Sequence, residues 1–214
     1  MLTEMNIQLP NHIAYRQKRM SLGVQPSKEL LGCGFMKKEL GSDHKDYRNG
    51  CWSISYVICG EGIYVLNGVE HPVGPGTIFQ RRPEETHSTH VTQAPPWVEC
   101  FIDFGPKMHE ALEAMGLCRP GCPVNSIGLS QTLVDEFAIL AEFIQSKGES
   151  EWVECTRRAF DLTLKLLGTA IQPKSHQDQE MVQKAQHDLA QHLELRFDLK
   201  RWCQKRQWDY DKFR

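Results

Sequence analysis

Residues 52–80, WSISYVICGEGIYVLNGVEHPVGPGTIFQ, carry the strongest indication of the chain's architecture. Short apolar and β-branched runs are separated by glycine and proline. The Asn67-Gly68 pair lies between two such runs and predicts a tight hairpin, because a type I′ turn needs positive φ at both central residues. Gly60-Glu61-Gly62 and Pro75-Gly76 are interpreted as two further turns. The stretch therefore predicts short antiparallel strands.

The same texture continues to residue 104, where a long β-rich run follows Pro95-Pro96. About six strands at a spacing of 8–12 residues predict an antiparallel sandwich or barrel. Alternation gives the last run, 97–104, two faces. One face carries Trp97, Glu99, Phe101 and Asp103, and the other carries Val98, Cys100, Ile102 and Phe104. We assign the apolar face to the core or to helix packing.

The pattern becomes helical after residue 106. Residues 107–115 predict a short helix, and an i, i+4 stripe from Leu129 to Ile144 predicts a longer one capped by Ser130. A further apolar face, with Phe160, Leu164 and Leu167, continues until Pro173 ends it. We expect two antiparallel helices followed by a polar linker.

The C-terminal residues show a second helical pattern. Apolar residues from Ala185 to Phe213 predict two short helices split by a tight turn, with a third just beginning. The predicted fold class is α+β: an antiparallel jelly-roll barrel, an α-helical hairpin and a partial helix-turn-helix. The predicted boundaries are an N-terminal arm 1–27, a ligand-binding domain 28–106, a helical dimerisation region 107–172, a linker 173–179 and the partial helix-turn-helix 180–214.

Composition narrows the functional classes. The chain has 214 residues, 40% of them hydrophobic, which is enough for a sizeable core. Its net charge of −2 gives the whole chain no electrostatic attraction to nucleic acid. We see no secretory signal and no run of about 18 apolar residues that could span a membrane. With eight cysteines and no signal sequence, the expectation is a cytoplasmic protein with reduced thiols and no membrane partner.

Two groups of residues together resemble the AraC family of bacterial transcription regulators. The first comprises Tyr56-Val57, Gly60-Glu61-Gly62, Gly68, Pro75-Gly76, Phe79, Pro83 and His87, and is similar to the family's ligand-binding cupin domain. The second comprises Ala185, Leu189, His192-Leu193, Phe197-Asp198-Leu199, Cys203 and Phe213, and is similar to its first helix-turn-helix. The resemblance implies a regulator that senses a small-molecule effector in the cupin and controls DNA binding through a homodimer.

The chain also departs from the family pattern. Trp202 is bulkier than the usual aliphatic residue, Arg206 stands where an apolar residue is common, Gln207 stands at the turn, and Asp209 replaces a serine. The family carries two helix-turn-helix units, whereas this sequence ends inside the first. We therefore expect specific DNA affinity only of a full-length protein and none of the 214 residues alone.

The resemblance implies particular site residues. For the effector they are Arg48, His87, Thr89, Glu99 and Phe101. A sugar is the first expected effector, because an aromatic face stacks on C–H groups while a carboxylate accepts hydroxyls, and an aromatic acid is the second. For DNA, Lys200, Arg201 and Lys205 would contact phosphate, and Lys212 and Arg214 would contact base edges.

We expect no metal, no cofactor, no catalytic residue and no enzymatic activity. A metal cupin needs two histidines and a carboxylate on one strand pair, and residues 52–59 contain neither residue type. Two alternatives remain open. One is a metal-dependent cupin enzyme such as an isomerase or dioxygenase, and the other is a stand-alone sensor or decoy without a DNA reader.

Overall fold

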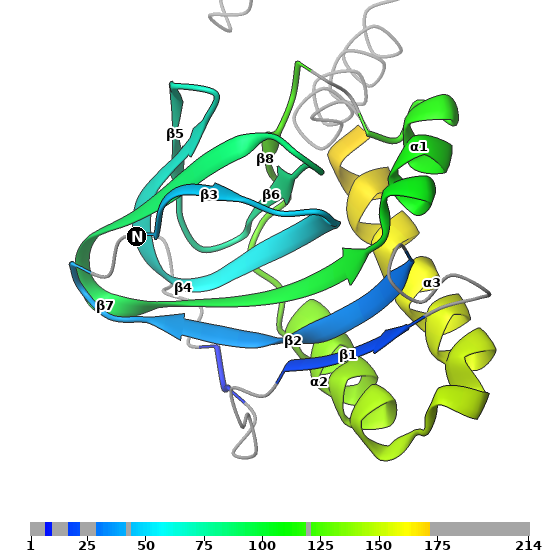
Figure 1. Cartoon of the computed structure of the whole chain (residues 1–214). Helices are drawn as coiled ribbons and strands as arrows, with labels where there is room; N and C mark the ends of the chain where they lie inside the picture. The colour runs from blue at the N-terminus through cyan, green and yellow to red at the C-terminus, as the bar shows by residue number, and fades with distance from the viewer. Residues whose placement is uncertain (1–6, 10–16, 22–28, 42–43, 119–120, 172–214) are drawn as a thin grey trace, which may run out of the picture. The chain divides into compact units, whose positions relative to one another are not determined.

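The long strands of the protein pair into one antiparallel sheet. The computed structural model describes residues 7–9, 17–21, 29–41, 44–118 and 121–171. The strands are β1 (Gln17–Ser21), β2 (Leu30–Lys38), β3 (His44–Arg48), β4 (Trp52–Leu66), β5 (Val69–Val73), β6 (Thr77–Arg81), β7 (Thr86–Phe104) and β8 (Val124–Ser126). The order is β1-β2-β7-β4-β6-β8, with β3 paired to β7 and β5 to β4. The sheet curls so that β3, paired with one end of β7, lies across from β4 (Figure 1), which confirms the prediction of a β-rich, rolled antiparallel fold.

Two of the predicted turns are present. Asn67 and Gly68 have φ values of 49° and 81°, and Leu66 pairs with Val69 across them, so the hairpin prediction is confirmed. Gly76, with φ 81°, occupies the second predicted turn, where the Thr77 amide donates to the Gly74 carbonyl. Positive φ is a conformation that glycine adopts without a Cβ penalty.

The predicted turn at Gly60-Glu61-Gly62 is wrong. Strand β4 runs through it, with register shifts against β7 between Val57 and Gly62. A Cβ on Gly60 would lie 2.7 Å from the Trp97 Cα, and a Cβ on Gly62 would lie 2.7 Å from the Trp97 ring. The glycines therefore mark a bulge where two strands approach closely, which produces the same sequence signal as a turn.

Other strand boundaries also differ from the predictions. Strand β7 continues through Pro95-Pro96, so the break expected there is absent. Strand β1 lies inside the predicted arm and pairs with β2. Strand β3 was not predicted, because its residues are exposed on both faces and carry no apolar alternation. The short strand β8 was not predicted.

The three helices predicted between residues 107 and 171 are confirmed. They are α1 (Pro106–Ala114), α2 (Gln131–Ser146) and α3 (Trp152–Ile171), with a short 3-10 helix at Glu149–Glu151 between the last two. The Ser130 hydroxyl accepts from the Leu133 amide at 3.4 Å, as expected of an N-cap. Helices α2 and α3 lie on the β1–β2 side of the sheet (Figure 1).

Two apolar clusters stabilise this part of the chain. The larger one lies between the outer face of the sheet and the helices, and includes the predicted apolar set Val98, Cys100, Ile102 and Phe104. Leu167 is buried in it, and Phe160 and Leu164 pack against it. The smaller cluster comprises Val57, Tyr64, Leu66, Val73, Phe79, Val91 and Trp97. Inward and outward residues thus alternate along β4 and β7.

Several predictions fall outside the described residues. These are the linker 173–179, the partial helix-turn-helix 180–214 and the DNA-contacting residues Lys200, Arg201, Lys205, Lys212 and Arg214. In the part of the chain that the structure describes, no helix combines the length and apolar character needed to cross a bilayer.

Candidate functional site

A cavity of about 290 Å³ opens among strands of the rolled sheet. Side chains from β1, β2, β3, β4, β6 and β7, and from the residue after β3, line it. They are Arg19, Met36, His44, Tyr47, Asn49, Ser53, Arg81, His87, Thr89, Phe101 and Asp103. The volume is at the lower end of the range of about 300–1,000 Å³ for small-molecule sites. The cavity therefore suits a small ligand that contacts both polar and apolar groups.

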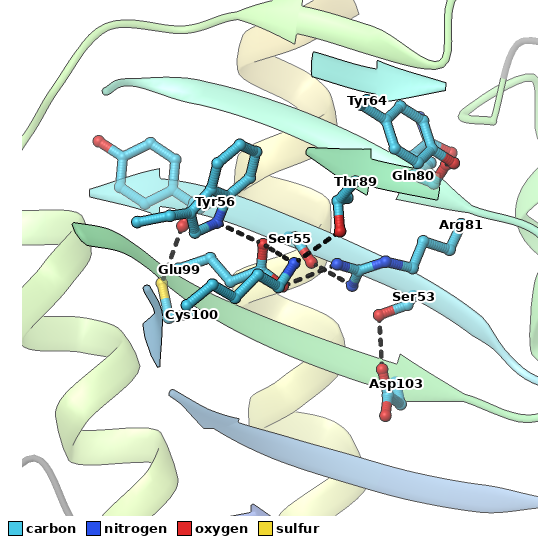
Figure 2. A network of polar contacts seen from close by, with 12 residues as sticks. Ser53, Ser55, Tyr56, Tyr64, Gln80, Arg81, Thr89, Glu99, Cys100 and Asp103 are labelled. Atoms are coloured by element: carbon cyan, nitrogen blue, oxygen red, sulfur yellow. Dashed lines mark hydrogen bonds and ion pairs between the residues drawn. The ribbon is translucent and has the colours of Figure 1, made fainter. Parts of the chain in front are cut away.

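The carboxylate of Glu99 organises the polar network beside the cavity. Arg81 Nη2 lies 2.7 Å from Glu99 Oε1, and Trp97 Nε1 donates to Oε2 at 2.8 Å. Lys38 Nζ lies 3.5 Å from the same Oε2 and donates to the Thr89 hydroxyl at 3.2 Å. Figure 2 shows the Arg81 guanidinium between Glu99 and the Ser55 hydroxyl, to which it donates at 2.8 Å.

Burial and charge shift the acid–base behaviour of these groups. Burial alone would raise the pKa of Glu99, but the charges of Arg81 and Lys38 outweigh it and hold that pKa well below its usual range. Burial lowers the pKa of Lys38 to about 8, against the opposing effect of Glu99. Near pH 7 the network therefore holds two cations and one anion.

A second ion pair lies closer to the surface. Asp103 accepts from the Ser53 hydroxyl at 2.5 Å through Oδ1 and from Arg19 Nη2 at 3.1 Å through Oδ2. The Asp103 side chain is 3% exposed and that of Arg19 is 50% exposed. Asp103 thus has a charged partner of its own, separate from the Glu99 network.

A histidine and a tyrosine form another part of the wall. The rings of His87 and Tyr47 meet edge to face at 5.4 Å between centroids. Burial, followed by the charge of Arg81, lowers the pKa of His87 to about 4. The imidazole is therefore neutral near pH 7 and has both a donor and an acceptor nitrogen.

The structure brings together some of the predicted effector residues. His87, Thr89 and Phe101 line the cavity, and Glu99 lies beside it without lining it. Arg48 does not line it, because its exposed guanidinium donates to the Glu84 carbonyl at 2.9 and 2.7 Å. That these residues bind an effector stays a prediction.

The sequence interpretation missed Arg81 and Asp103. Alternation along β6 places Thr77, Phe79 and Arg81 on one face, but the predicted strand ended at residue 80. Asp103 shares a face with Glu99 and Phe101, so alternation already pointed to it. Arg19 could not be found, because it comes from the predicted arm.

The described residues do not fit a metal centre. His44 and His87 both line the cavity. Within the described ranges, however, no three His, Cys, Asp or Glu side chains are grouped so that they could hold one ion.

Comparison with known proteins gives one family. The model of the AraC-like ligand binding domain matches residues 43–171. No curated protein matches the chain.

Solved structures that resemble the chain share little sequence with it. A predicted oxalate decarboxylase from Thermotoga maritima is 24% identical, with 42% of this chain and 80% of that chain covered and a TM-score of 0.31. A cupin domain from Schizosaccharomyces pombe is 10% identical, with 50% and 75% covered and a TM-score of 0.34. A salicylate 1,2-dioxygenase from Pseudaminobacter salicylatoxidans is 20% identical, with 39% and 23% covered and a TM-score of 0.32.

Proposed function

The chain belongs to the family of AraC-like ligand-binding domains, and we propose that it is the effector-sensing part of a transcription regulator and has no enzymatic activity. The observation that carries this proposal is the cavity of about 290 Å³, most of whose lining residues lie in the matched region. Its walls consist mostly of polar and charged side chains, and Met36, Tyr47 and Phe101 add apolar surface, so a small ligand could be held by both kinds of contact.

Strand β4 offers a route from the cavity to the helices. Ser53 lines the cavity, whereas Tyr56 faces the other way and stacks on Phe137 of α2. The Tyr56 hydroxyl accepts from the Ser130 amide and donates to the Gly128 carbonyl, both at 2.9 Å. A ligand that shifts β4 would therefore displace the start of α2.

We assign homodimer formation to the helices α2 and α3. Ile139 on α2 and Val153 on α3 are each 61% exposed, and Trp152 is 38% exposed. Two copies joined in this way would place two DNA readers on one symmetric site. In this proposal DNA is a partner of the regulator, through Lys200, Arg201, Lys205, Lys212 and Arg214.

A thermal-shift screen of sugars, polyols and aromatic acids tests effector binding, because a ligand that binds only the native state raises the melting temperature. The matched variants are Met36→Trp, which fills the cavity, and Met115→Trp, which changes a residue 55% exposed on the surface. We expect a shift in the wild type and in Met115→Trp, and none in Met36→Trp. If Met36→Trp responds as the wild type does, the cavity is not the site.

Elemental analysis tests the enzymatic alternative. A sensor of this kind is expected to purify without a stoichiometric transition metal. One bound metal ion per chain that persists after dialysis would instead favour a metal-dependent cupin enzyme.

A further inference from the structure

The charges at the cavity do not balance. Of the charged side chains that line it or bond to residues that do, within the described ranges, three are cations and two are anions. They are Arg19, Lys38 and Arg81, with Glu99 and Asp103. The two histidines in the wall, His44 and His87, both have lowered pKa values, so they add no charge near pH 7. Among the described residues, an excess of one positive charge remains.

The excess belongs to the Glu99 network. Asp103 is paired with Arg19, which leaves Arg81 and Lys38 sharing the single carboxylate of Glu99. The side chains of Lys38 and Arg81 are 2% and 10% exposed, so solvent screens them little. A buried charge without a counterion is costly, and an anion in the cavity would remove that cost.

Glu99 is not available to a neutral, hydroxyl-rich ligand. Its side chain is 0% exposed, and both of its oxygens already accept from Arg81, Trp97 or Lys38. The expectation of a sugar depended on a free carboxylate that accepts hydroxyls. In the structure that acceptor is occupied, so this reason for a sugar no longer holds.

Arg81, in contrast, is held in place while it faces the cavity. One of its terminal nitrogens donates a hydrogen bond to Glu99 and the other donates to the Ser55 hydroxyl. Its guanidinium carbon lies 4.8 Å from the Phe79 ring centroid. A guanidinium has five N–H donors, so two such bonds leave donors for a ligand. A planar group fixed in this way suits a carboxylate, which accepts two parallel hydrogen bonds.

We propose that the cavity binds a small monocarboxylate, with its anionic head on the Arg81 guanidinium and its apolar body against Met36, Tyr47 and Phe101. The inference rests on the proposed function, since it names the chemical class of the effector. The volume of about 290 Å³ limits the body to a short alkyl chain or a single ring. One negative charge matches the excess, whereas a second would have no partner.

Each acid is compared with its amide, which has nearly the same shape but no charge, so the difference in affinity measures the contribution of the negative charge. The 214-residue chain is titrated by calorimetry at pH 7 with acetate and acetamide, butyrate and butyramide, benzoate and benzamide, and with glucose and sorbitol. We expect at least one acid to bind about tenfold or more tightly than its amide. The Lys38→Met variant, which leaves Arg81 and Glu99 as a neutral pair, is expected to lose about tenfold or more of this acid affinity.

Lys165→Met is the matched control, because Lys165 is a half-exposed lysine paired with Glu136 between the helices. It should bind the acids as the wild type does. If Lys38→Met does not fold, the comparison of acids with amides in the wild type decides by itself. An amide or sugar that binds as tightly as the acids would overturn the carboxylate assignment and leave the sensing function standing. If no compound binds, or if Met36→Trp binds equally well, both proposals are contradicted.

Discussion

Single side chains set both the charge beside the cavity and the close packing of β4 against β7. The carboxylate of Glu99 holds Arg81 and Lys38 at the cavity, while Gly62 allows the Trp97 ring to pack against the backbone of β4. Such effects depend on one atom or one charge, so individual substitutions can test them.

Gly62→Ala should destabilise the protein by roughly 1–3 kcal/mol, because the new methyl group would overlap the Trp97 ring and the His90 carbonyl. Urea denaturation measures the change. Gly148→Ala is the control, since the nearest atom to its added Cβ is the Ser150 hydroxyl at 3.9 Å. Equal stability of the two variants would argue against the close approach of β4 and β7.

The depressed pKa of His87 predicts a loss of stability in mild acid. The unfolded chain takes up this proton near pH 6.5, but the folded chain takes it up only near pH 4, so the free energy of unfolding falls as the pH falls between these values. From pH 7 to pH 5, His87 should account for roughly 1–2 kcal/mol of the loss. Glu99 contributes only below its ordinary pKa of 4.5, outside this window.

The measurement compares urea midpoints at pH 7 and pH 5. His87→Gln should lose less stability between these pH values than the wild type. His71→Gln, on strand β5, should keep the wild-type loss. A His87→Gln variant as acid-sensitive as the wild type would place the titrating group elsewhere.

Among the elements, the long strands β4 and β7 could be predicted only in part. Alternation correctly separated the two faces of residues 97–104, and the Asn67-Gly68 hairpin was recognisable because its turn needs positive φ at both positions. The length of β4 was not recognisable. Before the bulge the inward residues have odd numbers, such as Ser55 and Val57, and after it they have even numbers, such as Tyr64 and Leu66. The alternation of this one strand therefore looks like that of two separate strands.

The sequence predicted only those cavity residues that lie on strands with a recognisable alternation. His87, Thr89 and Phe101 follow from the strand pattern and the family resemblance. Arg81 and Asp103 lie on strands that were recognised, but pairing between distant strands is what brings their charges together. Arg19 belongs to an edge strand without apolar alternation, and no local pattern marks it.

Tyr56 connects strand β4 to helix α2, and its hydroxyl can be tested separately from its ring. Tyr56→Phe should cost roughly 1–2 kcal/mol, because the hydrogen bonds with Gly128 and Ser130 are lost. Chemical denaturation with Tyr47→Phe as the control, where the side chain is 49% exposed, measures the difference. Equal costs would show that the hydroxyl does not support the start of α2.

At the scale of the whole sheet, the cavity lies on one face and the helices α2 and α3 pack on the other. Strands β4 and β7 contribute to both. In the proposed regulator, occupation of the cavity would change the dimer through these strands.

The helical surface should carry the dimer. Ile139→Glu places a charge on an exposed apolar position of α2 and is expected to weaken self-association about tenfold or more by sedimentation velocity. Val69→Glu is the matched control, since Val69 is 58% exposed on β5. A monomeric wild type, or a larger effect from Val69→Glu, would contradict the helical interface.

Methionine methyl NMR locates the ligand in one titration. Met36 lines the cavity, and Met115 is exposed on the surface, so the two methyl groups report on different places in the same sample. On addition of the acid that binds most tightly, the Met36 resonance should move and saturate while that of Met115 stays in place. A Met36 resonance that does not move while the melting temperature rises would contradict this prediction.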